Sequence, residues 1–366
     1  MNTHDIIELA TQLHQSRYRS RRIQNFMRDD LKNITIPSLT AEQKEFVKEV
    51  WKGIRVDYRW FSFFNMFREV GKDWSPYYVP SNLHYSLIDM YYTDYKKCRT
   101  IEDKNLNDLL FRDVKQPRTV VRTISGNLYD SSYFILERKD LASLFSEDKG
   151  YLIKPSIESG GGQQIVVWKP NQHTPLIDYL DKISSYRDCI VQEFSSQHQA
   201  MASLHPESLN TIRVMTFQHQ GRVDVLSTIV RMGVDGSTID NASVGGIFCG
   251  VDNQGRLKNI AYNDYGDIFD RHPSTHVTYS DHSIPNYSDC LKMAKKLHNR
   301  LVGFTRLISW DFAIDAAGNP ILIEVNATHG GISFHQMCNG PLFGDYTEEV
   351  IEEVFNKRNR FLSRIF

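Results

Sequence analysis

The sequence lacks several features that are each typical of one class of protein. Its five cysteines, Cys98, Cys189, Cys249, Cys290 and Cys338, are widely spaced with no CxxC pair, which argues against a disulfide framework and favours a reducing compartment. No apolar run approaches the roughly 18 residues of a membrane span. A net charge of −1 provides no basic excess, so nucleic acid is not expected as a partner.

Targeting segments, repeats and linkers are also missing. The opening stretch MNTHDIIELATQLHQ lacks the apolar centre of a signal peptide, so we expect a cytoplasmic protein. There is no internal repeat, low-complexity tract or Pro/Gly linker, although 366 residues predict two or three lobes. The one dense basic cluster, Arg17, Arg19, Arg21 and Arg22, indicates either a solvated surface or a phosphate contact.

The first quarter of the chain has a helical and strongly aromatic pattern. Residues 1 to about 52 are predicted to be helical, with Ile6, Leu9 and Leu13 at helical spacing and a capping box at Thr40–Gln43. Between Trp51 and Tyr95 lie 14 of the 43 aromatic residues. They predict an aromatic-rich helical core; the alternative is a surface that binds sugar rings or a partner.

From about residue 100 the pattern changes to short apolar runs. The predicted strands are Tyr151–Lys154, Gln164–Trp168, Cys189–Phe194, Thr211–Phe217, Val223–Arg231, Gly246–Val251, Leu307–Ile314 and Ile321–Val325. Helices are expected near Thr174–Ser184 and Tyr287–Phe304 and from about Thr347. This mixture indicates an α+β fold with mostly antiparallel sheet rather than regular βαβ alternation.

The stretch WDFAIDAAGNPILIEVN, residues 310–326, reads as a β-hairpin. If residue 315 pairs with residue 320, Asp311 lies opposite Glu324, and Asn326 shares the face of Glu324. Facing carboxylates destabilise a strand pair unless a cation lies between them, and a set of oxygen ligands suits Mg²⁺ or Mn²⁺. The hairpin therefore indicates a metal site; an exposed edge hairpin with acids facing water is the alternative.

A second motif joins a lysine to a glycine-rich loop. Lys154 ends a predicted strand, and Ser159, Gly160, Gly161 and Gly162 lead into the next strand. Such a backbone can present N–H groups to a polyphosphate while the lysine adds positive charge. The motif is neither a Walker A sequence nor a GxGxxG fingerprint. A plain hairpin turn is the alternative.

Two further strands carry candidate polar groups. Gln192, Glu193 and Phe194 end a strand that can offer a carboxylate and backbone groups to an adenine or ribose. In Asn210-Thr211-Ile212-Arg213-Val214, alternation puts Thr211 and Arg213 on one face, so that Arg213 can reach a phosphate. Asn210, Arg213 and the downstream Arg231 are the candidate catalytic residues; surface ion pairs are the alternative for the arginines.

In this order the motifs resemble the ATP-grasp superfamily over roughly residues 100–340. The closest likeness is to its sugar-transfer (surface-polysaccharide) associated group, and the hairpin resembles the pattern of D-alanine–D-alanine ligases. The resemblance implies an ATP-grasp fold, in which two α+β lobes with largely antiparallel sheets grip ATP, after an aromatic-rich, mostly helical N-terminal region. The expected divisions are 1–95, a core of 96–345 (linking part 96–150, glycine-loop lobe 151–195, metal lobe 196–345) and a C-terminal helix, 346–366.

The resemblance also implies roles for individual residues. Asp103-Lys104 is similar to a DK motif, so Lys104 and Lys154 would contact ATP phosphates beneath the loop from Ser159 to Gln163, with Glu193 at the hinge. The metal ligands Asp311, Glu324 and Asn326 would hold two Mg²⁺ ions, with Mn²⁺ as a substitute. The sequence departs from the pattern at Ser309, where ligases carry an arginine that Arg213 or Arg231 would replace, and at Gln163, where several branches have a basic residue.

The resemblance implies an ATP-dependent carboxylate–amine ligase that forms an acyl phosphate and acts on a sugar acid and an amino acid or amine, free or linked to a nucleotide or lipid. A kinase of the same fold and a non-catalytic nucleotide-binding protein are the alternatives. No nucleophilic serine is needed or seen. His329, His335 and Cys338 fit no common zinc spacing, and His329 is better placed to bind substrate. Two roles stay open for the aromatic segment, which are an oligomer interface and a substrate lid.

Overall fold

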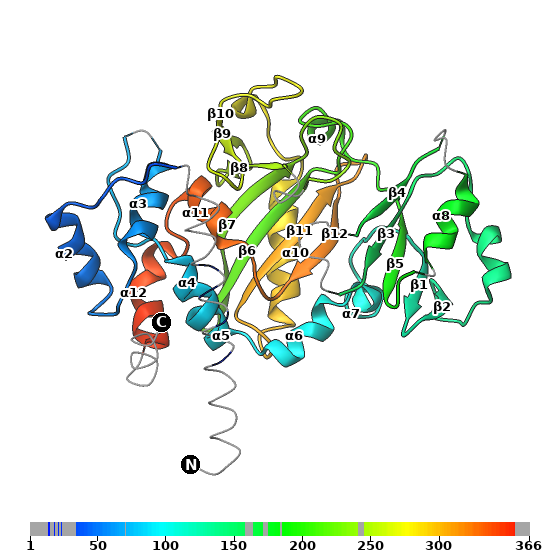
Figure 1. Ribbon diagram of the computed structural model, residues 1–366, viewed down its shortest axis with the longest axis horizontal. Coiled ribbons are helices and arrows are strands. Elements are labelled where there is room, and N and C mark those ends of the chain that lie inside the picture. Colours follow the sequence, from blue (N-terminus) through cyan, green and yellow to red (C-terminus); the bar gives the residue numbers. More distant parts are fainter. Residues whose placement is uncertain are drawn as a thin grey trace, which may run out of the picture.

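The computed structural model describes residues 34–69, 71–157, 164–170, 175–183, 185–240 and 245–355, together with His14, Tyr18, Arg21 and Ile23. Two β-sheets and the helices around them form an α+β fold (Figure 1). All the pairings between the strands described here are antiparallel, as the sequence predicts. The predicted helix through Ile6, Leu9 and Leu13 lies outside the described residues, as do Arg17, Arg19 and Arg22.

The smaller sheet has five strands in the order β2-β1-β5-β3-β4. Their bounds are β1 Thr119–Ile124, β2 Asn127–Asp130, β3 Tyr151–Pro155, β4 Val166–Trp168 and β5 Cys189–Glu193. One face packs on a core that includes Phe145, Trp168 and Tyr179, partly supplied by helix α8 (Leu176–Ile183). The predicted strands β3, β4 and β5 are confirmed, whereas β1 and β2 were not anticipated, because polar residues interrupt their apolar pattern.

The larger sheet has seven strands in the order β10-β9-β8-β7-β6-β11-β12. Their bounds are β6 Thr211–His219, β7 Arg222–Met232, β8 Ile247–Val251, β9 Leu257–Tyr262, β10 Ile268–Phe269, β11 Leu307–Ile314 and β12 Pro320–Asn326. The five strands predicted here are confirmed, and β9 and β10 are additional. Helix α10 (Tyr287–Asn299) covers one face, and it ends five residues before the predicted end at Phe304.

The remaining helices are short. They are α2 Ala41–Val50, α3 Tyr58–Met66, α4 Ser81–Leu83, the π-helix η1 His84–Ile88, α5 Asp89–Tyr92, α6 Tyr95–Glu102, η2 Lys104–Leu106, α7 Asn107–Leu110, η3 Arg138–Leu144, α9 Gln199–Ala202, η6 Tyr279–Asp281, α11 Ile332–Asn339, η7 Gly344–Tyr346 and α12 Thr347–Val354. None of the helices in the described part of the chain is long and apolar enough to cross a membrane.

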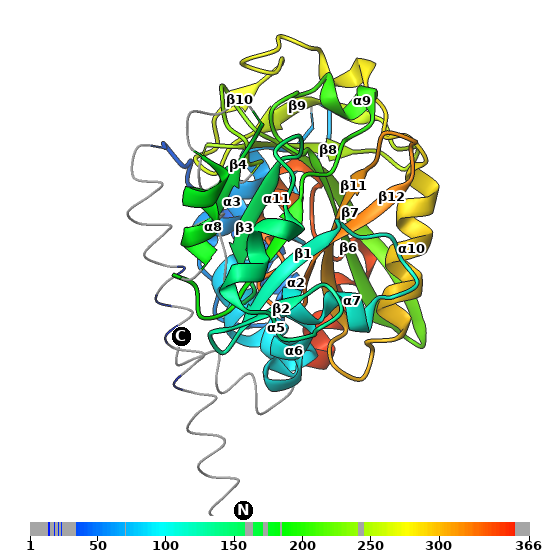
Figure 2. The ribbon, with the colours of Figure 1, turned by 90° about the vertical axis from the view of Figure 1, so that its right-hand side faces the viewer.

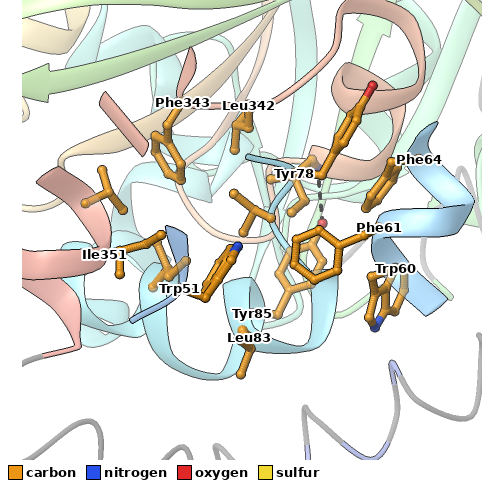
Figure 3. Packing of buried hydrophobic residues seen from close by; sticks show 14 of the residues in the cluster. Trp51, Trp60, Phe61, Phe64, Tyr78, Leu83, Tyr85, Leu342, Phe343 and Ile351 are labelled. Carbon is orange, nitrogen blue, oxygen red and sulfur yellow. Dashed lines mark hydrogen bonds between the residues drawn. The ribbon is translucent and has the colours of Figure 1, made fainter. Parts of the chain in front are cut away.

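The aromatic segment forms a buried core, as expected. Trp51, Trp60, Phe61 and Phe64 pack with residues of α11 and α12 and with strands of the larger sheet (Figure 3). Helix α2 begins with the predicted capping box, in which Gln43 N–H donates to Thr40 Oγ1 at 3.1 Å. The first helices and α12 therefore share one hydrophobic core.

The two sheets meet at β12, the edge strand of the larger sheet (Figure 1). The chain crosses between them after α7, where Leu322 N–H donates to the carbonyl oxygen of Lys115 at 2.9 Å. Figure 2 shows the smaller sheet in front of the larger one, with α6 and α7 below. This arrangement places the ends of β3 and β5 near the hairpin of β11 and β12.

Candidate active site

The hairpin of β11 and β12 brings two carboxylates face to face. Asp311 pairs with Glu324, as predicted, and Asn326 Nδ2 donates to Asp311 Oδ2 at 3.2 Å. The assumed pairing of residues 315 and 320 is wrong, because Ile314 pairs with Pro320. A register shift between Asp311 and Phe312 then restores the opposition of the acids. A β-bulge of this kind inserts one extra residue into one strand.

Two arginines from neighbouring strands bind Asp311. Arg213 on β6 is its cross-strand partner and forms a bidentate pair, with Nε to Oδ1 and Nη2 to Oδ2 both at 2.7 Å. Arg231 on β7 donates from Nη2 to Asp311 Oδ2 at 3.0 Å and from Nε to Thr211 Oγ1 at 2.9 Å. The structure thus brings both candidate arginines to the first metal candidate, although they are distant in sequence.

The charges in this network are fixed by their neighbours. Burial raises the pKa of Asp311, but Arg213 and Arg231 outweigh burial and lower its pKa to about 2. Burial lowers the pKa of Arg213, and the nearby Asp311 reverses that effect and raises it above its ordinary value. Asp240, which accepts a hydrogen bond from Thr211, has its pKa raised by burial against the pull of Arg231. Asp311 and Arg213 are therefore charged at neutral pH.

Two lysines approach the same hairpin, Lys104 from η2 and Lys154 from β3 of the smaller sheet. Lys104 forms an ion pair with Glu324 (Nζ to Oε1, 2.7 Å), and its N–H donates to Ser156, just beyond β3. Lys154 on β3 is 8% exposed, and no described residue bonds to its Nζ. Burial, then repulsion from Lys104, lowers the pKa of Lys154 to about 8. A buried cation without a partner is costly, which is typical of a group that receives a ligand.

The oxygen atoms around the hairpin fit a hard divalent cation. Burial raises the pKa of Glu324, but the nearby Lys104 outweighs burial and brings the pKa below its ordinary value. This carboxylate is therefore ionised. Asp311 Oδ1 accepts one hydrogen bond, while Glu324 Oε2 and Asn326 Oδ1 accept none from the described residues. These oxygens retain the acceptor capacity that Mg²⁺ requires. No group of three His, Cys, Asp or Glu side chains in the described ranges is arranged for a metal, so a site on this hairpin would have to include the amide oxygen of Asn326.

The predicted hinge residues lie where the chain leaves the smaller sheet. Gln192 is buried at the end of β5, and its Oε1 has no hydrogen-bond partner among the described residues. Glu193 receives ion pairs from Arg118 and Lys149. Phe194 N–H donates to Gly150 at 2.9 Å. The loop residues Ser159, Gly160, Gly161 and Gly162, and also Gln163, lie outside the described residues.

Asn210 is not brought into the cluster with the arginines. It is fully buried, and its Nδ2 donates to the carbonyl oxygens of Met201 and His205, both at 2.8 Å. Its Oδ1 accepts from Ser208. The structure therefore shows Asn210 fixing the loop before β6, and any direct part in catalysis stays a prediction.

His329, His335 and Cys338 also take separate positions. His335 Nδ1 bonds to Ser227 Oγ at 2.8 Å, and burial lowers its pKa to about 3. Cys338 Sγ points to the carbonyl oxygen of Phe248, whereas His329 is exposed. These contacts give each residue a different environment.

Sequence reasoning missed the residues that fix the loop after β12. Ser309 Oγ donates to the carbonyl oxygen of Gly330 at 2.8 Å. Glu102 accepts hydrogen bonds from Thr328 N–H at 2.6 Å and from its Oγ1 at 2.9 Å. The signals were the glycine pair after Asn326 and the acid two residues before Lys104. A β-carbon at Gly330 would lie 2.8 Å from Ser309 Oγ, so a residue with a side chain at position 330 would collide with Ser309.

Residues 84–350 match the sugar-transfer associated ATP-grasp family, and the chain belongs to that family. Among solved structures, the ATP-grasp ligase PsnB complexed with a minimal precursor is 15% identical, with 71% of this chain and 63% of PsnB covered and a TM-score of 0.40. L-amino acid ligase from Bacillus licheniformis is 14% identical (68% and 48% covered, TM-score 0.38). D-alanyl-alanine synthetase A from Vibrio cholerae is 10% identical (72% and 63% covered, TM-score 0.36).

The chain covers less than two thirds of each of these three proteins, and similarity at this level carries no argument about substrates. No curated protein matches the sequence significantly. Family membership establishes the ATP-grasp fold. ATP-grasp enzymes are ADP-forming ligases that use ATP and Mg²⁺.

Proposed function

We propose that this protein is an ATP-dependent carboxylate–amine ligase that forms an acyl phosphate and joins an amine or amino acid to a sugar acid for surface polysaccharide. The observation that best supports this proposal is that Lys104, Lys154 and Arg213 lie around the carboxylates of Asp311 and Glu324. Lys154 from the smaller sheet, Lys104 from η2 and Arg213 from the larger sheet surround the two acids, which is the arrangement that a bound nucleoside triphosphate requires.

Lys154 and Arg213 supply the donors for the transferred phosphoryl group. Arg213 uses Nε and Nη2 to hold Asp311, and its Nη1 has no hydrogen-bond partner among the described residues. Lys154 Nζ is likewise unpaired within that part of the chain. Arg213 is fixed by Asp311 before substrate arrives, so it stabilises developing negative charge without reorganisation. Arg213 thereby takes the role of the arginine that ligases carry at the position of Ser309.

Asp311, Glu324 and Asn326 would hold Mg²⁺ through the three oxygens that retain acceptor capacity. When bound there, the metal neutralises charge on the phosphate oxygens. Arg231 keeps Asp311 oriented through its bond to Oδ2 and is itself held by Thr211. Gln192 and Glu193 would face the adenine or ribose at the end of β5.

The reaction is a pair of displacements. The substrate carboxylate oxygen attacks the γ-phosphorus of ATP, and the bond to the bridging oxygen breaks to release ADP. The amine nitrogen then attacks the carbonyl carbon of the acyl phosphate, the carbon–oxygen bond to phosphate breaks, and the amine loses a proton. Neither step needs a nucleophilic side chain, because positioning and charge stabilisation supply the catalysis.

The decisive experiment incubates the protein with ATP, Mg²⁺ and a panel of sugar acids, amino acids and amines, and measures ADP, phosphate and product mass. A ligase releases ADP and free phosphate and gives a product one water lighter than its two components. A product heavier by one phosphoryl group, without free phosphate, would establish a kinase instead. ATP binding without turnover across the panel would support a non-catalytic role.

A further inference from the structure

The loop after β12 holds one histidine in an unusual conformation. Thr328 is tied to Glu102, and Gly330 is tied to Ser309, so His329 lies between two anchored residues. His329 has a φ of 54° and an exposed side chain. A left-handed backbone is strained for a residue that carries a side chain. Such strain persists only where the surroundings impose it, and it is frequent at ligand-binding sites.

Two tyrosines from the segment before the ATP-grasp motifs position this imidazole. The ring of Tyr85 is stacked on it at a centroid distance of 5.7 Å and an angle of 22°, and the ring of Tyr95 lies edge-on at 6.0 Å and 81°. Both hydroxyls have partners, since Tyr85 accepts from Ile332 N–H at 3.3 Å and Tyr95 donates to Asp89. Tyr85 also belongs to the aromatic core (Figure 3), so the platform has a rigid base.

The backbone under Tyr85 is itself irregular. Residues His84–Ile88 form a single π-helical stretch between α4 and α5. Short π-helical segments are rare and occur frequently at functional sites. A π-helical turn at His84–Ile88 and a left-handed His329 from a distant loop thus meet at one stacking contact.

This contact adjoins the proposed catalytic arginine. A β-carbon at Gly331 would lie 3.1 Å from Arg213 Nη1, so the loop backbone passes directly beside that guanidinium. His329 is two residues before Gly331. The histidine and its tyrosines therefore border the site on the side of Arg213, while Lys154 approaches from the smaller sheet.

We propose that Tyr85, Tyr95 and His329 form a stacking platform that binds the pyranose ring of the sugar substrate. The inference rests on the proposed function and assigns its substrate class to a particular surface. Aromatic rings with fixed polar tips present an apolar face to the C–H face of a sugar while leaving its hydroxyls free. Tyr85 backs one face of the imidazole, and the exposed ring of His329 is the surface that the substrate meets.

The test uses ligand-observed saturation-transfer NMR titrations of the full chain with Mg²⁺ and AMP-PNP. The probes are D-glucuronate, D-galacturonate and D-glucosamine, with L-alanine and L-lysine for comparison. His329→Gly removes the ring while glycine accepts the left-handed backbone, which protects the fold. Tyr95→Leu is the second variant. His276→Gly is the matched control, because His276 is an exposed histidine with a φ of 58° on another loop.

We expect at least one sugar to bind the wild type and the control, and its affinity to fall about fivefold to tenfold in both platform variants, as for loss of an aromatic contact. AMP-PNP affinity should be unchanged. Equal sugar affinity in all four proteins, binding of amino acids alone, or no binding of any probe would overturn the platform while nucleotide binding stands. A wild type that fails to bind AMP-PNP would overturn the proposed function itself, and the platform with it.

Discussion

Lys154 offers a test of the site that requires no substrate. Its folded-state pKa of about 8 lies below the ordinary value of 10.5, and each unit of difference corresponds to ~1.4 kcal/mol. The unfolded chain therefore binds the proton more tightly, and the charged lysine destabilises the free protein by on the order of 3 kcal/mol at pH 7. We expect Lys154→Met to raise the free energy of unfolding by that order in urea denaturation at pH 7, without nucleotide or Mg²⁺.

The sign of the pH dependence and a matched variant sharpen this test. Because the unfolded state holds more protons between pH 8 and 10.5, wild-type stability should rise across that window and the advantage of Lys154→Met should shrink. Lys104→Met should act in the opposite direction. It leaves Glu324, whose side chain is 30% exposed, without its cation, which we expect to cost ~1–3 kcal/mol. A Lys154→Met protein less stable than the wild type at pH 7 would refute the assignment of Lys154 as an unpaired buried cation.

Three further outcomes follow from the same geometry. Glu324→Gln should reduce the rate of ADP release by more than about 100-fold, because removing even a residue that supports a metal ligand lowers activity ~10–100-fold. Its circular dichroism spectrum should be unchanged. An active variant would rule out the metal assignment. Gly331→Ala should lower kcat by displacing Arg213 and should reduce the free energy of unfolding by ~1–2 kcal/mol. Gly340 has a φ of 91° and open space around it, so Gly340→Ala should reduce stability by a similar amount and leave kcat unchanged. Equal losses of kcat in the two variants would contradict the contact between Gly331 and Arg213. For the wild type, kcat/KM for ATP should fall as pH rises through about 8, and Lys154→Arg should flatten that limb; an unchanged limb would assign it to another group.

The hairpin shows both what the sequence could predict and what it could not. Alternation and turn composition placed Asp311 against Glu324, but the turn pairing was off by one residue and the register shift at Phe312 compensated for it. A bulge leaves no signature in an alternating apolar pattern. The bidentate contact of Arg213 with Asp311 depends on the pairing of β6 with β11, which is a long-range choice that local sequence does not determine. Local periodicity therefore supplied the strands, and tertiary pairing supplied the site.

The two tyrosines of the platform were missed for a related reason, whereas the sequence already indicated His329 as a substrate-binding residue. Tyr85 and Tyr95 belong to a segment in which aromatics predict a core, and that prediction is correct for most of them. Only the stacking on His329, far along the chain, distinguishes these two from their buried neighbours. Composition identifies an aromatic core but does not show which of its members lie beside the proposed substrate site.

The shared core of the first and last helices has a consequence for the protein during its synthesis. Trp51 packs edge-on against Phe355 at a ring-centroid distance of 6.0 Å, and α12 completes the cluster begun by α2 and α3. Ribosomes add ~5–20 residues per second, so the early helices wait for many seconds with an uncovered apolar face. We expect the nascent chain to be held by chaperones until α12 emerges, and release of truncated chains to cause aggregation rather than accumulation of a folded N-terminal unit.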